Sequence, residues 1–322
     1  MINFKLLQSE KGPYVFNHIL NLQGFLLAST VGSDLTIFKK DKASISHHKT
    51  MSRLTKAPIV SMASTVDKSY AIVVDEESFV LLYPGEDFRT VHRASLPRDF
   101  YPRSVICTPD SEYFLIQGRQ SLIIYSFNKL KEPITLDEVV GEDTFITSTA
   151  FKDNLLLVAD DSGTILCLDM LRLDQGVDEA TTSIIALDGA IQDIKIQGEW
   201  VYAFSSTWDI CVMKLTNEEL ELKNTVLNIR PSIEGGVELS QPISYNIQRG
   251  IIQILSCGSN GIVTAALYKL NGADISPSDI AYMSGPKAYV CDAVASSIAM
   301  DSRCVVYAAE YEQGAINVFV RQ

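Results

Sequence analysis

The feature that most constrains the fold of this chain is a weak repeat of one pattern of two strands. An apolar strand, a short polar turn and a second strand with alternating apolar residues recur seven times in 322 residues. The second strand carries two apolar or small residues spaced by two: Leu35/Ile37, Phe79/Leu81, Leu122/Ile124, Ile165/Cys167, Ile210/Val212, Ile262/Thr264 and Ile316/Val318. Counted on the first member of each pair, the intervals are 44, 43, 43, 45, 52 and 54 residues. Alternation with period two predicts strands that bury one face.

The polar turns and two further strands complete each repeat. The turns are Val31–Asp34, Asp75–Ser78, Gly118–Ser121, Asp160–Gly163, Ser205–Trp208, Gly258–Gly261 and Tyr311–Gly314. An inner strand is predicted before each hairpin from the second repeat onward, at residues 60–64, 104–108, 148–152, 192–196, 243–247 and 291–295. An outer strand is predicted after each of the first six hairpins, at 44–50, 90–96, 134–139, 181–187, 221–227 and about 275–283. No proline falls in a predicted central strand, as the hydrogen bonds of a sheet require.

Four strands per unit at a period of about 40 to 45 residues predict an all-β fold, a β-propeller. We expect a single domain over residues 1–322 with seven blades of four antiparallel strands. The blades fall at about 14–50, 56–97, 101–140, 145–187, 190–229, 240–283 and 289–322. The last blade lacks an outer strand, so we expect residues 3–8 to supply it and close the ring, which removes an unpaired edge.

At this point the whole chain resembles the WD-repeat (WD40-like) β-propeller family in pattern. The segment Asp160 to Asp169, Asp-Asp-Ser-Gly-Thr-Ile-Leu-Cys-Leu-Asp, is similar to the turn and third strand of that family. The Trp-Asp pair that ends this strand in the family is replaced here, for example by Phe38-Lys39 and Tyr83-Pro84. Trp208-Asp209 lies in a turn and does not match that position. The resemblance implies a non-catalytic scaffold or adaptor subunit of a larger complex.

Composition and cysteine spacing indicate an intracellular protein. The chain has no run of 18 or more apolar residues, so no membrane-spanning helix is expected, and the N-terminal residues do not resemble a secretory signal. The six cysteines show neither a CxxC pair nor a disulfide rhythm. They are expected to be reduced, which favours the cytoplasm or the nucleus.

Charge is unevenly distributed along the chain. The net charge is −12, which argues against nucleic acid as the principal ligand and favours a basic protein partner. Residues 137–188 hold twelve acidic side chains against Lys152 and Arg172. Residues 39–56 hold six basic side chains against Asp41 alone. This basic stretch supports an alternative, a nucleic-acid or phosphoinositide binder.

Catalytic and metal-binding patterns are weak. The four histidines are His18, His47, His48 and His92, and none has another His or Cys at ligand spacing. Asp160–Gly163 lacks the further oxygen ligands of a calcium loop and is predicted to be a hairpin turn. We therefore expect no cofactor, no metal and no enzymatic activity. A propeller-based enzyme or nucleotide-exchange factor, with a site assembled from separate loops, remains the alternative.

Two features predict a surface that binds a protein partner. The first is the loop from Pro97 to Arg103, in which Arg98, Phe100 and Tyr101 lie between two prolines and Arg103 follows the second. Arginine and aromatic residues are enriched at binding hot spots, and prolines reduce the cost of ordering a loop. The second is Trp208 in a turn, which the resemblance places on the same face. The alternative is that Phe100 or Tyr101 packs between blades and that Trp208 is buried.

Overall fold

The computed structural model describes residues 2–11, 15–42, 44–216, 219–231, 239–248, 250–258, 263–284, 295–300, 305–310 and 315–321. Within these residues the regular structure is β-strand, apart from the 3-10 helix η1 (Met170–Gln175) and the short helix α1 (Val177–Ala180). The all-β fold predicted from the alternating pattern is confirmed.

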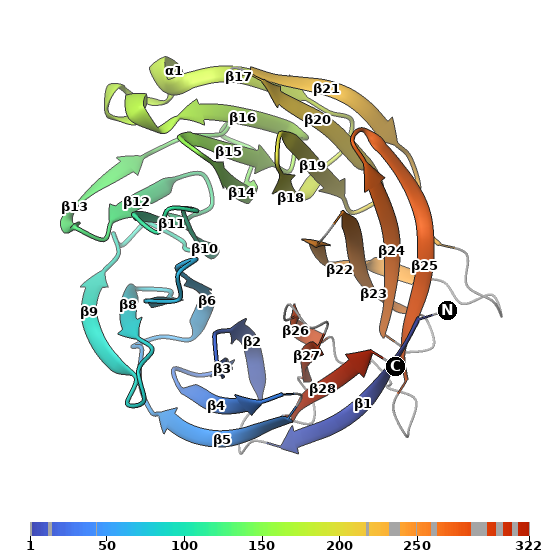
Figure 1. The fold of residues 1–322 in the computed structure, drawn as a ribbon. Helices are drawn as coiled ribbons and strands as arrows, with labels where there is room; N and C mark the ends of the chain where they lie inside the picture. The colour runs from blue at the N-terminus through green and yellow to red at the C-terminus, as the bar shows by residue number, and fades with distance from the viewer. Residues whose placement is uncertain are drawn as a thin grey trace. The chain divides into compact units, whose positions relative to one another are not determined.

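Five sheets each contain four strands that are consecutive in the chain and antiparallel to their neighbours (Figure 1). The first two sheets are β2 (Phe16–Asn21), β3 (Phe25–Thr30), β4 (Leu35–Asp41), β5 (Ser44–Met51), then β6 (Ile59–Ser64), β7 (Ala71–Asp75), β8 (Ser78–Tyr83), β9 (Arg89–Ser95). The next two are β10 (Ser104–Cys107), β11 (Tyr113–Gln117), β12 (Leu122–Ser126), β13 (Lys129–Leu136), then β14 (Ile146–Lys152), β15 (Leu155–Asp160), β16 (Thr164–Asp169), β17 (Thr181–Ala186). The fifth is β18 (Ile191–Gln197), β19 (Trp200–Ser205), β20 (Ile210–Thr216), β21 (Glu219–Val226).

The remaining strands form one eight-stranded order, β22-β23-β24-β25-β1-β28-β27-β26. Their bounds are β22 (Leu239–Gln248), β23 (Ile251–Gly258), β24 (Val263–Asn271), β25 (Asp274–Ser284), β1 (Ile2–Lys11), β28 (Ala315–Arg321), β27 (Val305–Glu310) and β26 (Ala295–Met300). Strand β1 pairs antiparallel with β28, from Phe4↔Arg321 to Lys11↔Ala315. The N-terminal strand therefore pairs with the last strand, as the sequence predicts for residues 3–8.

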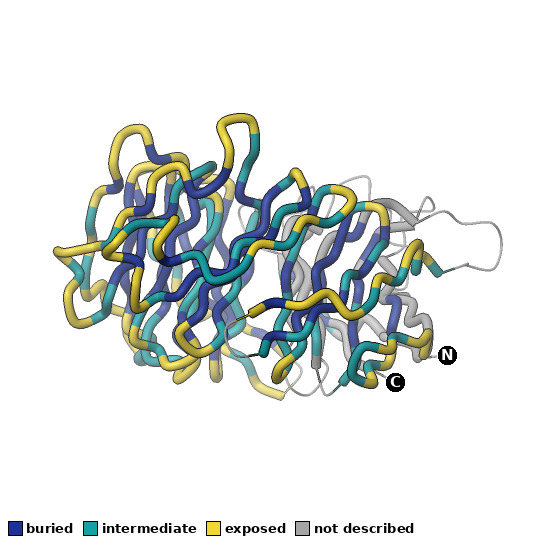
Figure 2. Tube along the Cα trace, turned by 90° about the horizontal axis from the view of Figure 1, so that it is seen from above, coloured by how far each residue is buried: buried dark blue, intermediate teal, exposed yellow. Residues whose placement is uncertain are grey.

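Contacts divide the chain into two compact units. The first unit contains Met1–Cys107, Asn260–Val263 and Ala281–Gln322, and the second contains Thr108–Ser259 and Thr264–Ile280. Within each unit the central strands are buried and the turns are exposed (Figure 2). In the first unit, Ile316 and Val318 of β28 join the cluster of Phe16, Leu26 and Phe38 from the first sheet. The core of each unit therefore lies between neighbouring sheets and is filled by the alternating residues of the repeat.

One backbone feature recurs in the turns between the first and second strands of a sheet. Where the structure describes these turns, a residue with positive φ occupies each of them: Gly24, Lys68, Ser111, Asp153, Gly198 and Gly250. Two of the turns share a longer pattern, in which a threonine hydroxyl accepts a hydrogen bond from the amide of a tyrosine five residues later. The distance is 3.0 Å both from Tyr70 N to Thr65 Oγ1 and from Tyr113 N to Thr108 Oγ1. The repeat is thus kept in backbone geometry where the residue identities differ.

Aspartates hold two of the polar turns predicted between second and third strands. The buried carboxylate of Asp75 accepts hydrogen bonds from the amides of Glu77 and Ser78. Asp160 accepts from Ser162 N at 3.0 Å and from Thr164 N at 2.8 Å. The segment Asp160–Gly163 is therefore a hairpin turn between β15 and β16, as predicted. The turn at Tyr311–Gly314, and Gly258–Gly261 beyond its first residue, lie outside the described residues.

Two predicted strands differ from the structure. The outer strand expected at 134–139 is β13, which begins at Lys129 and includes Pro133. A proline is tolerated there because β13 is the outermost strand of its sheet, where one row of amides has no ladder partner. The inner strand expected at 291–295 falls largely outside the described residues, and β26 begins at Ala295.

Candidate functional site

The loop from Pro97 to Arg103 connects β9 and β10 in the first unit. The amide of Phe100 donates a hydrogen bond to the carbonyl of Pro97 at 3.1 Å, which closes a tight turn. Phe100 is 7% exposed, and Pro102 is also buried. Two apolar side chains therefore anchor the loop to the body of the unit.

The residues beside these anchors face solvent. Tyr101 is 67% exposed, and Arg98 and Arg103 are exposed as well. Four of the predicted partner-binding residues thus lie on one loop, but they have two different roles. The exposed set is Arg98, Tyr101 and Arg103, whereas the expectation of an exposed Phe100 is wrong, because its ring anchors the turn.

Trp208 is buried, so the expectation of an exposed tryptophan is also wrong. It belongs to the turn between β19 and β20, has φ of 69° and is 1% exposed. Its ring lies in the apolar cluster of the second unit with Phe204 and Tyr245. A positive φ is uncommon for a residue other than glycine, and at this turn it accompanies an inward side chain. The alternative from the sequence, burial of Trp208, is correct.

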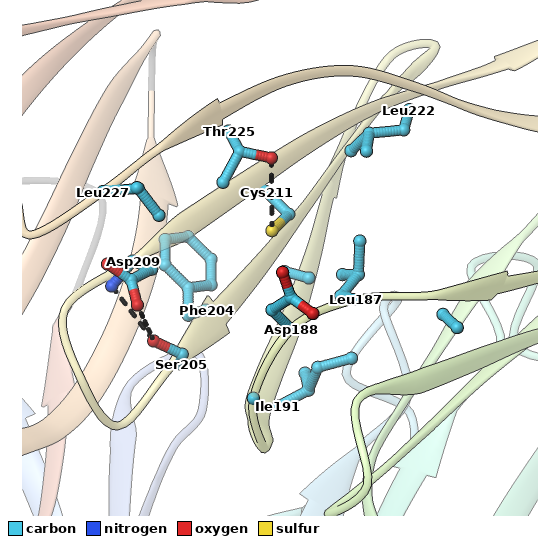
Figure 3. Close-up of a pocket in the computed structure, with 13 residues that line it drawn as sticks. Leu187, Asp188, Ile191, Phe204, Ser205, Asp209, Cys211, Leu222, Thr225 and Leu227 are labelled. Atoms are coloured by element: carbon cyan, nitrogen blue, oxygen red, sulfur yellow. Dashed lines mark hydrogen bonds between the residues drawn. The ribbon is translucent and has the colours of Figure 1, made fainter.

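A pocket opens in the second unit beside this turn (Figure 3). Its volume is about 180 Å³. Thirteen residues from the end of β17, the loop after it and strands β18 to β21 line it: Ala186, Leu187, Asp188, Gly189, Ile191, Ala203, Phe204, Ser205, Asp209, Cys211, Leu222, Thr225 and Leu227. The loop after β17 forms one wall of the pocket and is hydrogen-bonded to Gly163, since Leu187 N donates to Gly163 O at 2.9 Å.

The polar groups of the pocket are two carboxylates, two hydroxyls and a thiol. Asp209 accepts a hydrogen bond from Asn228 N at 2.7 Å and from the hydroxyl of Ser205 at 3.3 Å. Asp188 is exposed in the loop after β17. The hydroxyl of Thr225 donates to Cys211 Sγ at 3.8 Å (Figure 3). Asp209 is thus fixed by its turn, while Asp188 faces solvent.

The thiol of Cys211 reports the electrostatics of this pocket. Burial raises its pKa above the ordinary value, and the negative charges of Asp209 and Asp188 raise it further. The hydrogen bond from Thr225 acts in the opposite direction and lowers it. The thiol is therefore kept protonated at neutral pH, which makes it a poor nucleophile. The same field favours a positively charged ligand at the pocket.

Sequence reasoning missed this pocket. Its residues come from segments up to 41 positions apart, from Ala186 to Leu227, and none belongs to a known motif. One signal was present in the predicted outer strand at 221–227, which includes two leucines. Leu222 and Leu227 at the outer edge of the fifth sheet are 45% and 72% exposed. Apolar residues at such positions mark surfaces that bind ligands or partners when they border a pocket.

The basic stretch at residues 39–56 lies in β4, β5 and the loop after them in the first unit. Lys40 and Lys49 form side-chain hydrogen bonds within the unit. Lys40 donates to the side chain of Asn21, and Lys49 donates to Asp87 O at 2.7 Å. Lys39, Arg53 and Lys56 are exposed. The stretch therefore presents a basic surface to solvent.

Three further findings concern the part of the chain that the structure describes. There, no group of three or more His, Cys, Asp or Glu side chains is arranged to hold a metal ion. No helix in that part is both long and apolar enough to span a bilayer. Cys107, Cys167 and Cys211 are free thiols.

Comparison with known proteins identifies the architecture. No protein-family model matches the sequence, and no curated protein sequence matches it. Among solved structures, the fold is similar to the crystal structure of the β-propeller domain of Cps50 (Swd1) from Myceliophteria thermophila, with a TM-score of 0.74. The match covers 98% of this chain and 99% of that chain, at 11% sequence identity. With its repeated four-stranded antiparallel sheets, the chain therefore has a β-propeller fold.

Proposed function

We propose that this protein is a non-catalytic scaffold that binds another protein within a larger intracellular assembly. The observation that carries this proposal is the loop from Pro97 to Arg103. Its exposed Arg98, Tyr101 and Arg103 are of the residue types that dominate binding energy at interfaces. Because Phe100 and Pro102 hold the loop, little conformational entropy is lost on binding.

Three further observations support the scaffold role. The similar structure is a β-propeller domain, and propellers present extended rims of loops to partners. The net charge of −12 favours a basic partner. Free thiols at Cys107, Cys167 and Cys211 fit a reducing compartment, either cytoplasm or nucleus.

The proposal includes seven blades over residues 1–322, with residues 3–8 as the outer strand of the last blade. The pairing of β1 with β28 supports it. The side-chain amide of Gln8 also bonds both backbone groups of Ile45, with Nε2 donating to O at 2.7 Å and Oε1 accepting from N at 2.8 Å. Deletion of residues 1–10 should therefore lower the melting temperature sharply, because it unpairs β28. An unchanged melting curve would contradict this closure.

The scaffold role is tested by affinity purification of the full-length tagged protein from its native cells. We compare the wild type with a double variant, Arg98→Ala with Tyr101→Ala, and with Tyr83→Ala as the matched control. Tyr83 is also an exposed tyrosine beside an arginine in the first unit, with Arg89 over its ring.

A stoichiometric protein partner should co-purify with the wild type and with Tyr83→Ala. The double variant should lose at least about thirtyfold in affinity, because truncation of a hot-spot aromatic commonly costs about 2 kcal/mol or more. Absence of any stoichiometric protein partner would overturn the scaffold role. Unchanged binding by the double variant would remove the loop as its contact.

A further inference from the structure

We infer that the pocket between the loop after β17 and strands β19 to β21 is a docking site for one apolar side chain flanked by arginine or lysine. The ligand is a segment of a partner protein, so the inference rests on the proposed function and adds the partner's chemistry. It concerns the second unit alone and does not involve the loop from Pro97 to Arg103.

The size and lining of the pocket specify the apolar part of the ligand. Its volume is about 180 Å³. An apolar protein cavity of about 150 Å³ is large enough to hold benzene. Leu187, Ile191, Phe204, Leu222 and Leu227 are the large apolar residues of its lining. The space therefore accepts one branched aliphatic or aromatic side chain.

The rim of the pocket extends this apolar surface beyond the hollow. Leu222 and Leu227 belong to the wall and also face solvent, and Leu227 is 72% exposed. A bound segment would cover both side chains. Burial of apolar area is worth about 25 cal/mol per Å², so the rim contributes to binding of the residues next to the inserted side chain.

The charges of the pocket specify the flanking residues. None of the thirteen lining residues is a lysine or an arginine, whereas Asp188 and Asp209 are both present. Both carboxylates act on the thiol of Cys211 within the pocket. A carboxylate, phosphate or nucleic-acid ligand would be repelled by these charges. A lysine or arginine beside the apolar side chain is attracted by them.

Three lysines on strands of the same sheet are paired with acids other than Asp188 and Asp209. Lys195 pairs with Asp193 at 2.7 Å, and Lys214 pairs with Glu199 at 3.4 Å. Lys223 pairs with Glu221 on β21. Each of these three cations is thus engaged by an acid outside the pocket lining, and the charges of Asp188 and Asp209 remain available to a ligand.

Photo-crosslinking of the full-length protein tests this site without a known partner. The probe is a biotinylated pentapeptide in which photo-leucine, a leucine analogue that carries a diazirine, lies between two arginines. The first control probe replaces both arginines with glutamates. Unlabelled competitor peptides carry leucine or glycine between arginines. Adducts are located by mass spectrometry of the digested protein.

Three variants identify the pocket as the site of labelling. Thr225→Trp fills the hollow from β21, and Thr90→Trp places the same residue on the exposed outer strand β9 of the first unit as the control. Asp188→Asn removes one exposed charge of the rim. Asp174→Asn removes an equally exposed charge that does not line the pocket. Melting curves of all variants establish that each is folded.

The arginine probe should label the pocket residues at least about fivefold more than the glutamate probe, and only the leucine competitor should suppress the signal. Thr225→Trp should reduce labelling at least tenfold. Asp188→Asn should reduce it about two- to fivefold, the range for an exposed ion pair. Thr90→Trp and Asp174→Asn should label like the wild type. Equal labelling by both probes, adducts elsewhere, or full labelling of folded Thr225→Trp would overturn the inference.

The two proposals fail in distinguishable ways. If a partner co-purifies from native cells but probe labelling does not depend on the pocket, the scaffold role stands and the docking site is wrong. If no protein partner co-purifies, the scaffold role is wrong, and with it the assignment of the pocket to a partner protein. If Thr225→Trp also weakens the native partner while Thr90→Trp does not, both are supported.

Discussion

The loop from Pro97 to Arg103 and the pocket beside β21 differ in the chemistry that they offer to a ligand. The loop exposes two arginines and one aspartate, with Tyr101 facing solvent and Phe100 buried. The pocket is concave and acidic, with Phe204 and Leu187 in its wall and Asp188 at its rim. A ligand segment that suits the arginines of the loop is not expected to suit the two carboxylates of the pocket. We therefore propose two contacts of different chemistry, one in each unit.

The two surfaces also differ in how binding is related to stability. The contact residues of the loop are exposed, so their removal should weaken a partner without unfolding the chain. Several residues of the pocket wall belong to the core: Ile191 and Ala203 lie in the cluster between the fourth and fifth sheets, and Phe204 packs with Trp208. Changes behind this wall should therefore alter stability and ligand binding together.

The largest expected effect is a difference in the free energy of unfolding between a variant at Trp208 and a variant at Tyr101. Trp208→Ala should lower the free energy of unfolding by about 3 to 5 kcal/mol, because it leaves a cavity in the core. Tyr101→Ala, at 67% exposure, should change it by no more than about 0.5 kcal/mol. Denaturant titration measures both values. Phe100→Ala should lower the free energy of unfolding much as Trp208→Ala does, although Phe100 is the direct neighbour of Tyr101 in the loop.

This comparison breaks down if Tyr101→Ala unfolds the chain as readily as Phe100→Ala. That result would mean that Tyr101 packs against the protein in solution, and the loop would lose its role as a contact surface.

A smaller effect is expected at Gly163, which supports the wall of the pocket. A Cβ atom at this position would lie 2.3 Å from Leu187 O and 2.8 Å from Gly189 O, and φ is +98°. Gly163→Ala should therefore displace the loop after β17 and destabilise the chain. We expect about 2 to 4 kcal/mol from the backbone conformation and the steric overlap together. Labelling of the pocket by the arginine probe should fall in parallel.

Gly176→Ala is the matched control, because φ is +109° there and a Cβ would meet no atom within 4 Å. It carries only the conformational cost, about 1 to 2 kcal/mol. It should leave labelling of the pocket unchanged. Equal costs for the two variants would show that the loop after β17 moves without resistance and does not form a rigid wall.

The sequence predicted the strands because apolar residues alternate with period two in part of each repeat, although in the structure the central strands β7 and β15 are buried at every residue. Strand β5 follows its predicted range of 44–50 within one residue, and Leu35 and Ile37, the predicted pair of the first repeat, are both buried in β4. Prediction was poorer for β13, which was expected to begin after Pro133 at residue 134 but begins at Lys129 and includes Pro133. The proline is accommodated because only one side of an outermost strand needs amide donors.

The candidate sites were harder to predict, since the direction of a side chain in a turn depends on backbone geometry. Phe100 and Tyr101 are neighbours of similar chemistry, and only the tight turn from Pro97 decides which one is buried. Trp208 points inward from a turn with positive φ, which residue type does not indicate. The pocket depends on contacts between two sheets, and no pattern within one repeat encodes them.

The smallest expected effect concerns the thiol of Cys211, which tests whether the carboxylates act inside the pocket. Burial has the largest effect and raises its pKa. The hydrogen bond from Thr225 lowers the pKa, and the charges of Asp209 and Asp188 raise it. Asp188→Asn should therefore lower the pKa slightly, and Thr225→Val should raise it. Only the thiolate reacts with iodoacetamide. Below the pKa, a lower pKa means a larger thiolate fraction and faster alkylation.

At pH 8 we expect Asp188→Asn to alkylate Cys211 about twofold faster than the wild type, as the weak interaction of an exposed charge implies. Thr225→Val should be slower, and Asp174→Asn should match the wild type. The difference should vanish once the pH exceeds the pKa, because the thiol is then ionised in every variant. Cys107, whose pKa burial raises to about 12, provides an internal reference in the same digest.

If Asp188→Asn leaves the rate unchanged while Thr225→Val slows it, the field of Asp188 does not reach the pocket. The preference for an arginine beside the inserted side chain would then have to depend on Asp209 alone.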